Sequence, residues 1–169
     1  EISLITARSV TKELRKQNKY KLFLSEPDGN FVKKLRKIKP DLVFNLLHGR
    51  YGEDGYIQSI LESEKIKYTH SGVLSSSLAI DKEISKKIFL NNGILTPPYF
   101  KFSYTHNFNL NNLIKKIDKK LKFPVVVKPL NEGSSVNVNI CNKTNIIKAL
   151  RLIKHYKKVM VEEFIGGRE

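Results

Sequence analysis

The 169-residue chain has no tryptophan, one methionine, one cysteine, and only 16 acidic residues against 31 basic ones. Its single cysteine, Cys141, cannot form a disulfide within the chain, and no CxxC motif or Cys/His cluster suggests a zinc site. No apolar run approaches the roughly 20 residues of a membrane span, and no charged-then-apolar leader opens the chain. We therefore expect a cytoplasmic protein that has no membrane partner.

The basic residues are mostly lysines, 25 against 6 arginines, and the formal net charge is +15. No segment alternates base-stacking aromatic residues with arginine, as proteins that bind single strands do. Most lysines stand opposite apolar positions of helix-like segments, so we expect solvated helix faces and no nucleic-acid partner. The positive surface should still attract small polyanions.

Hydrophobic periodicity predicts a mixture of helices and strands, and so an α/β or α+β protein. In the first part we expect helices at 2–17, 31–38 and 56–64 and strands at 20–24 and 41–47. The run 41–47 is nearly continuously apolar, which is typical of a buried parallel strand. In the second part we expect helices at 82–91, 110–121 and 144–156 and strands at 99–103, 124–128, 136–141 and 158–164. We place the domain boundary near residues 72–80, which gives domains 1–75 and 76–169.

The first candidate site is the sequence HGRYGEDG at residues 48–55, directly after the predicted strand 41–47. Ligands of open α/β sheets bind at the carboxyl ends of strands, glycines allow close backbone approach, and a following helix N-terminus favours anions. For His48 we favour a functional role over a packed one. The simplest interpretation of Glu53 and Asp54 is that they are charges in the first turn of a helix.

Two further segments carry candidate chemistry. Lys128 ends a β-branched run ahead of the loop 131–135, NEGSS. We favour a phosphate-binding role for this lysine and loop over an ordinary strand followed by a turn. The run 159–165 is apolar and carries two carboxylates, with Glu169 shortly after. Such acids could bind an adenine amino group and ribose hydroxyls, although without context they would be ordinary surface acids.

In this order, these segments resemble D-alanine–D-alanine ligases, which are ATP-grasp enzymes. The HGxxGEDG and EGSSV elements are highly specific to that family. The matching stretches run along the whole chain: residues 1–4, 48–55, 68–73, 81–82, 128–129, 132–136, 161–165 and 167–169.

The resemblance implies a Rossmann-like N-terminal pre-ATP-grasp domain, followed by the first part of an ATP-grasp α+β domain. Such ligases use ATP to phosphorylate the carboxylate of one D-alanine, and the amine of a second D-alanine attacks the acyl phosphate. The products are the dipeptide for peptidoglycan precursors, ADP and phosphate. The resemblance also implies a homodimer. Phosphoryl transfer of this kind depends on positioning and charge neutralisation.

The resemblance also implies roles for individual residues. Glu1 would hold the ammonium group of the first D-alanine, and His48 would lie beside its carboxylate. Ser134 would sit in a mobile loop over the phosphates and bond back toward Glu1. The nucleotide would be held by two lysines on its phosphates, by a phosphate loop, and by residues around its base and ribose: Lys82, Lys128, Glu132, Gly133, Ser134, Ser135, Glu162, Phe164, Ile165 and Glu169.

The chain departs from the family pattern in several places. His70 and Asn137 stand where the family usually has glycine. The family's opening strand and glycine-rich loop would precede Glu1. Its transition-state arginine, lid and Mg²⁺ ligands would follow Glu169, so we predict no metal ligand here. We therefore expect a ligase fragment, truncated at both ends and inactive alone. A D-alanine–D-lactate ligase and an inactive nucleotide-binding remnant are the alternatives.

Overall fold

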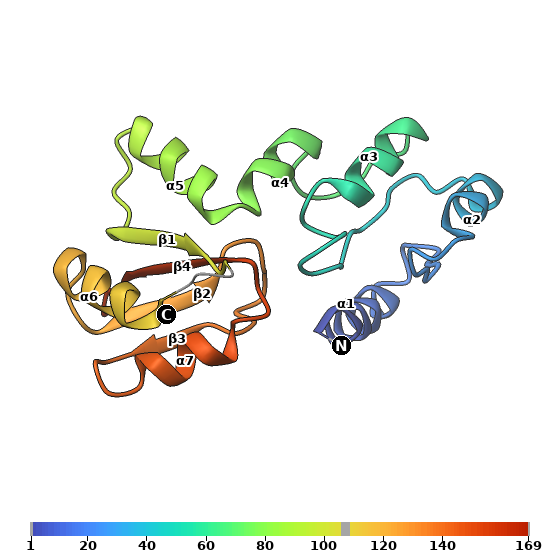
Figure 1. Ribbon diagram of the computed structural model, residues 1–169. Helices are drawn as coiled ribbons and strands as arrows, with labels where there is room; N and C mark the ends of the chain where they lie inside the picture. The colour runs from blue at the N-terminus through green and yellow to red at the C-terminus, as the bar shows by residue number, and fades with distance from the viewer. Residues whose placement is uncertain (1, 106–108, 169) are drawn as a thin grey trace. The chain divides into compact units, whose positions relative to one another are not determined.

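The computed structural model describes residues 2–105 and 109–168, and the chain divides into two compact units, Glu1–Ile80 and Asp81–Glu169 (Figure 1). The first unit contains helices α1 (Ile2–Lys16), α2 (Phe31–Ile38), α3 (Tyr56–Ser63) and α4 (Val73–Ala79). The second contains helices α5 (Lys82–Asn91), α6 (Leu110–Lys120) and α7 (Ile146–Leu152), and strands β1 (Tyr99–Ser103), β2 (Val125–Pro129), β3 (Asn139–Cys141) and β4 (Lys158–Glu163). No helix among the described residues is long and apolar enough to cross a bilayer.

The second unit is built on a four-stranded sheet in the order β1-β4-β2-β3, in which every neighbouring pair is antiparallel. The register places Val126 of β2 opposite Glu162 of β4, and Lys128 opposite Met160. Because residues two apart on a strand share a face, Lys128 and Glu162 lie on the same face of the sheet.

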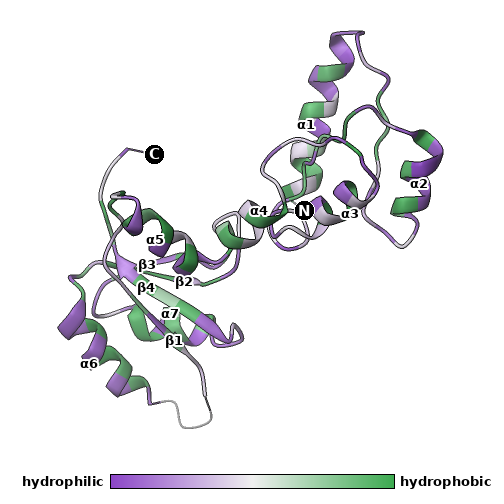
Figure 2. Cartoon of the chain, turned by 90° about the horizontal axis from the view of Figure 1, so that it is seen from above, coloured by the Kyte–Doolittle hydropathy of each residue, from purple (hydrophilic) through white to green (hydrophobic). Residues whose placement is uncertain are grey.

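The other face of this sheet carries the main hydrophobic core. Side chains alternate along β2, so that the first, third and fifth residues are buried. Helices α6 and α7 cover this face with their apolar sides, and Figure 2 shows apolar and polar bands alternating around α6. The buried core residues are Leu113, Ile117, Leu121, Val125, Val127, Cys141, Ile146, Ala149, Leu150, Ile153, Val159 and Val161.

Helix α5 lies against the face that carries Lys128 and Glu162 (Figure 1). The helix begins at Lys82 because the Asp81 carboxylate accepts two backbone N–H groups of the first turn, at 3.0 and 3.1 Å. Three of its apolar side chains are 37 to 44% exposed (Ile84, Ile88 and Phe89). The buried residue of α5 is Lys86, because a buried carboxylate on the sheet pairs with it.

The first unit has a small core, formed by Phe31 and Leu35 of α2 with Ile57 and Leu61 of α3. Two predicted strands are absent from it. Residues 20–24 join no ladder, and the run 41–47 forms a single parallel bridge, between Val43 and Tyr68. A strand needs a neighbour for its backbone groups, and the described part of this unit offers these segments no longer partner.

Several predicted boundaries are confirmed, and others move. The structure has α2, α5 and β1 at the predicted limits, whereas β3 and α7 are shorter than 136–141 and 144–156. Strand β3 begins late because Ser134, Ser135 and Asn137 all have φ between +50 and +55°, which no strand tolerates. Helix α4 was not predicted, since its sequence VLSSSLA has a weak helical pattern.

Candidate active site

His48 opens the loop of residues 48–55, and α1 holds it on one side. Its backbone N–H donates to Ser3 Oγ at 3.0 Å, and its Nε2 lies 3.0 Å from Thr6 Oγ1. The side chain remains 33% exposed. The imidazole is therefore fixed by side-chain contacts and still accessible to a ligand.

Glu53 holds the other side of the imidazole. One carboxylate oxygen lies 3.3 Å from His48 Nδ1, and the other accepts the Gly49 N–H at 2.6 Å. The interpretation of Glu53 and Asp54 as first-turn helix charges is wrong, because α3 begins only after both residues. The glycines at 49 and 52 offered the signal, since such a turn brings residue 53 back beside residue 48.

The rest of the loop is closed by two exposed hydrogen bonds to Asp54 and two buried ones to the Gly52 carbonyl. Asp54 accepts backbone N–H groups from the loop and from the first residue of α3, at 2.9 and 3.1 Å. The Gly52 carbonyl accepts the side-chain amides of Asn45 and Gln58, each at 2.9 Å. A Cβ at Gly52 would lie 2.3 Å from Leu47 Cβ, so this position has room only for glycine.

In the second unit, Lys82 reaches from the start of α5 to the loop after β2. Its Nζ donates to the Glu132 carbonyl and, at 3.4 Å, to the Leu130 carbonyl. Burial lowers the pKa of Lys82 from its ordinary value of 10.5, and the neighbouring Lys128 ammonium lowers that pKa further. The two lysines predicted to bind phosphates are therefore close enough to repel each other.

Glu162 lies between two lysines. One carboxylate oxygen accepts a hydrogen bond from Lys128, and the other, Oε2, forms an ion pair of 2.8 Å with Lys86. Oε2 is fully buried, and the Lys86 ammonium is its charged partner. The sequence analysis missed Lys86, because no motif distinguishes it from the other lysines of the helix.

The predicted phosphate loop follows β2 directly. Its residues Ser134 and Ser135 are exposed and have left-handed backbone conformations. The Val136 N–H donates to the Gly133 carbonyl at 3.1 Å, which closes one turn of the loop. The loop therefore presents exposed hydroxyl groups beside Lys82.

Phe164 and Ile165, the two residues predicted to line the base, follow directly after β4. Phe164 and Ile165 are 39 and 64% exposed, and the Phe164 backbone is held by a hydrogen bond of 3.0 Å to the Pro124 carbonyl. Their apolar side chains are available to a ligand. Glu1 and Glu169 lie outside the described residues, so their roles remain predictions.

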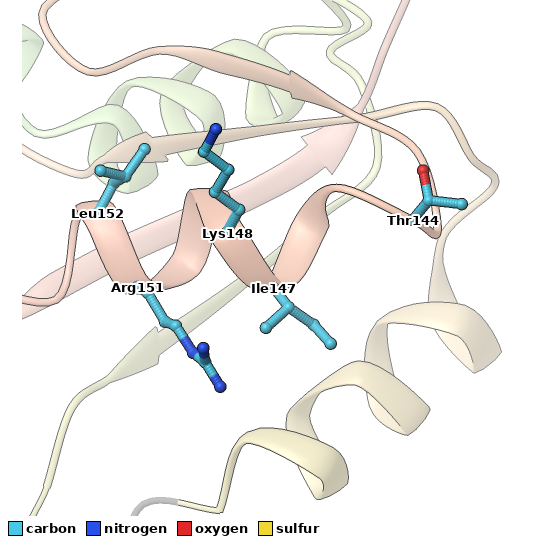
Figure 3. Close-up of a pocket in the computed structure, with 5 residues that line it drawn as sticks. All are labelled: Thr144, Ile147, Lys148, Arg151 and Leu152. Carbon is cyan, nitrogen blue, oxygen red and sulfur yellow. The ribbon is translucent and has the colours of Figure 1, made fainter.

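A separate open hollow of about 450 Å³ lies along α7. Figure 3 shows Lys148 and Arg151 projecting from different sides of the helix. None of the predicted site residues lines this hollow, which is formed by Thr144, Ile147, Lys148, Arg151 and Leu152.

No group of three His, Cys, Asp or Glu side chains could hold a metal ion within residues 2–105 and 109–168. The groups available there for phosphates are lysine ammonium groups, serine hydroxyls and backbone N–H groups.

A mixed α/β chain with lysines gathered beside a Gly-Ser loop has the features of a phosphate-binding protein. The comparison with known families defines it further. The model "D-ala D-ala ligase N-terminus" matches residues 27–71, and "D-ala D-ala ligase C-terminus" matches residues 88–169. The chain belongs to the D-alanine–D-alanine ligase family, as its motifs predicted.

Individual relatives agree with this assignment. The chain is 62% identical over 168 residues to a D-alanine–D-alanine ligase of Pelagibacter ubique, aligning 99% of this chain with 54% of that protein. It is 42% identical to one from Carboxydothermus hydrogenoformans, over all of this chain and 54% of the relative. The chain thus spans about half the length of the curated relatives it matches.

Solved structures give the same result for the fold. The D-alanine–D-alanine ligase of Bacillus anthracis matches with a TM-score of 0.78 and 36% identity, over 98% of this chain and 53% of that one. The same enzyme complexed with ATP matches with a TM-score of 0.75 and 33% identity, over 98% and 54%. The predicted α/β ligase fold is confirmed.

Proposed function

We propose that this protein serves in the ATP-dependent joining of two D-alanine molecules. The observation that carries the proposal is the gathering of Lys82, Lys128 and Glu162 beside the Gly-Ser loop in one unit. In this proposal, as predicted, domain 76–169 binds ATP and domain 1–75 binds D-alanine. The assembly is proposed to be a homodimer, which light scattering would test.

The chain's own residues supply positioning and charge for this reaction. Lys82 and Lys128 would neutralise phosphate oxygens, and Ser134 and Ser135 would donate hydroxyl hydrogen bonds to them. Glu162, as the family resemblance implies, would accept a hydrogen bond from the exocyclic amino group of adenine. The exposed ring of Phe164 and the exposed aliphatic side chain of Ile165 would cover the base.

In the first unit, His48 would act on the carboxylate of D-alanine. Its contacts with Glu53 and Thr6 leave the imidazole oriented and partly open, which suits a group that must stay in place while charge develops nearby. Mg²⁺, when bound with ATP, would supply positive charge that neutralises the phosphates.

The experiment that tests the function is ATP titration of the purified protein, followed by ADP release with and without D-alanine. Lys128→Met should weaken ATP binding by about tenfold or more, because a charged contact to phosphate is lost. The exposed neighbour Lys122→Met is the matched control and should bind ATP as wild type does.

The other outcomes separate the alternatives. Because residues 1–169 are expected to be inactive alone, ADP release is measured on the full-length protein; ATP binding there with no D-alanine-dependent ADP release would indicate a nucleotide-binding remnant. Activity with D-lactate as the second substrate would indicate a ligase of the depsipeptide type. No ATP binding at all would contradict the proposal.

Alkaline pH should weaken ATP binding through Lys82. Its lowered pKa means that the free protein loses this positive charge below pH 10.5, where an ordinary lysine stays protonated. Phosphates favour the charged form, so ATP should bind with proton uptake, and its affinity should fall as pH rises through that pKa. Calorimetry in buffers of different ionisation enthalpy measures this uptake.

The control for this pH effect is Lys82→Arg, because a guanidinium keeps its charge throughout this range. The variant should lose most of the alkaline fall in affinity and the proton uptake. If wild type and variant share the same pH profile, Lys82 does not bind the phosphates.

A further inference from the structure

The helix that carries Lys82 buries a second lysine, one turn further along, on the same sheet face. The Lys86 side chain is 9% exposed, and its Nζ lies 2.8 Å from Glu162 Oε2. Nζ also donates to the Pro97 carbonyl at 2.9 Å and lies 5.2 Å from the centre of the Tyr99 ring. An ammonium group held in this way from several sides has little freedom to leave.

The two lysines on Glu162 differ in this respect. Lys128 is 17% exposed, and it lies near the end of β2, next to the phosphate loop. When ATP binds, Lys128 must pair with the phosphates as well as with Glu162. A carboxylate at this depth that lost its counter-ion would be strongly destabilised, unless a second cation remained with it.

We propose that Lys86 is a positioning residue for nucleotide binding: it keeps the Glu162 carboxylate paired when ATP binds, and so frees Lys128 to bind the phosphates. This inference rests on the proposed function, and it deepens it by assigning a role to a residue outside every motif of the family resemblance. Without Lys86, Lys128 would be the ion-pair partner left to Glu162 among the described residues, and Glu162 would compete with ATP for it.

The test measures the dissociation constants of ATP and adenosine for the purified protein and its variants. Lys86→Met should weaken ATP binding by about tenfold, the scale of one charged hydrogen bond, and adenosine binding by much less. A merely structural role for Lys86 would weaken both ligands alike. Lys86→Arg should restore most of the ATP affinity, because it returns the positive charge.

A double-mutant cycle separates the proposed role from general damage. In a Glu162→Gln background no carboxylate competes for Lys128, so adding Lys86→Met should change ATP affinity by less than about twofold. The matched control is Lys87→Met, which removes the next lysine of α5, 63% exposed and paired with Glu83. It should bind ATP as wild type does.

Different results would contradict the role of Lys86 and the proposed ATP-dependent function. If wild type binds ATP and Lys86→Met binds it equally well, or loses adenosine to the same degree, the role of Lys86 is wrong and the proposed function stands. An unchanged effect of Lys86→Met in the Glu162→Gln background also overturns it. If wild type binds no ATP, the proposed function and this inference both fall.

Discussion

Replacing Glu162 by leucine is expected to lower the free energy of unfolding by about 3 to 5 kcal/mol, the usual cost of removing one partner from a buried ion pair. Two lysines pair with this carboxylate. Lys86 is buried, and its other partners among the described residues are the Pro97 carbonyl and the Tyr99 ring. Leucine would leave that ammonium group without a counter-charge. Urea denaturation followed by circular dichroism measures the loss.

The variant's pH dependence supplies a second readout of the same cause. An ammonium group buried without a partner has a lowered pKa, so above that pKa the folded state binds fewer protons than the unfolded state. The stability of Glu162→Leu should therefore rise with pH from that lowered pKa toward about 10.4, the value of a free lysine.

The control for Glu162 is an exposed pair of the same unit, Asp118 with Lys143, whose side chains are 50 and 66% exposed. Asp118→Asn should cost less than about 1 kcal/mol, because solvent already screens that pair. An equal cost at both sites, or a Glu162→Leu deficit that does not shrink at alkaline pH, would contradict the explanation from burial.

Gly55→Ala should destabilise the first unit by about 2 to 4 kcal/mol, from backbone strain and overpacking together. Gly55 has a φ of +92°, and a Cβ there would lie 2.3 Å from Ser77 Oγ and 2.9 Å from the Val73 carbonyl oxygen. The added methyl would push α4 away from the loop of residues 48–55. Chemical denaturation gives the loss of stability.

Gly49→Ala is the matched control, because it separates strain from collision. Gly49 belongs to the same loop and has a φ of +69°, but a Cβ there meets no atom within 4 Å. It should cost only about 1 to 2 kcal/mol, the strain of a left-handed residue. If both variants lose equal stability, the contact with α4 does not determine the need for glycine at position 55.

Helices whose ends are fixed by nearby residues in the sequence could be predicted from the sequence. Asp81 marks the start of α5 and the Asn92-Gly93 pair its end, so the range 82–91 was confirmed at both limits. The run 41–47 failed for the opposite reason. Its apolar residues suit a strand, but a ladder also requires a neighbouring segment, and no property of the run itself supplies one.

The candidate site divides in the same way. Local motifs found His48, Lys128 and Glu162, and the family resemblance added Lys82. The structure brings Lys82, Lys128 and Glu162 together in one unit. The partners that hold them were not predictable, because Lys86 resembles every other lysine of an amphipathic helix until the sheet face beneath it is known. Tertiary packing alone selected it.

The strand order also has a consequence for synthesis on the ribosome. The order β1-β4-β2-β3 places β4 between β1 and β2, although β4 is the last of these strands to be made. A nascent chain can form the β2–β3 hairpin early, but β1 gains its partner only once residues 158–163 have emerged. Until then β1 has no strand partner within the sheet. Its unpaired backbone groups should make the incomplete chain prone to aggregation, which chaperones counteract.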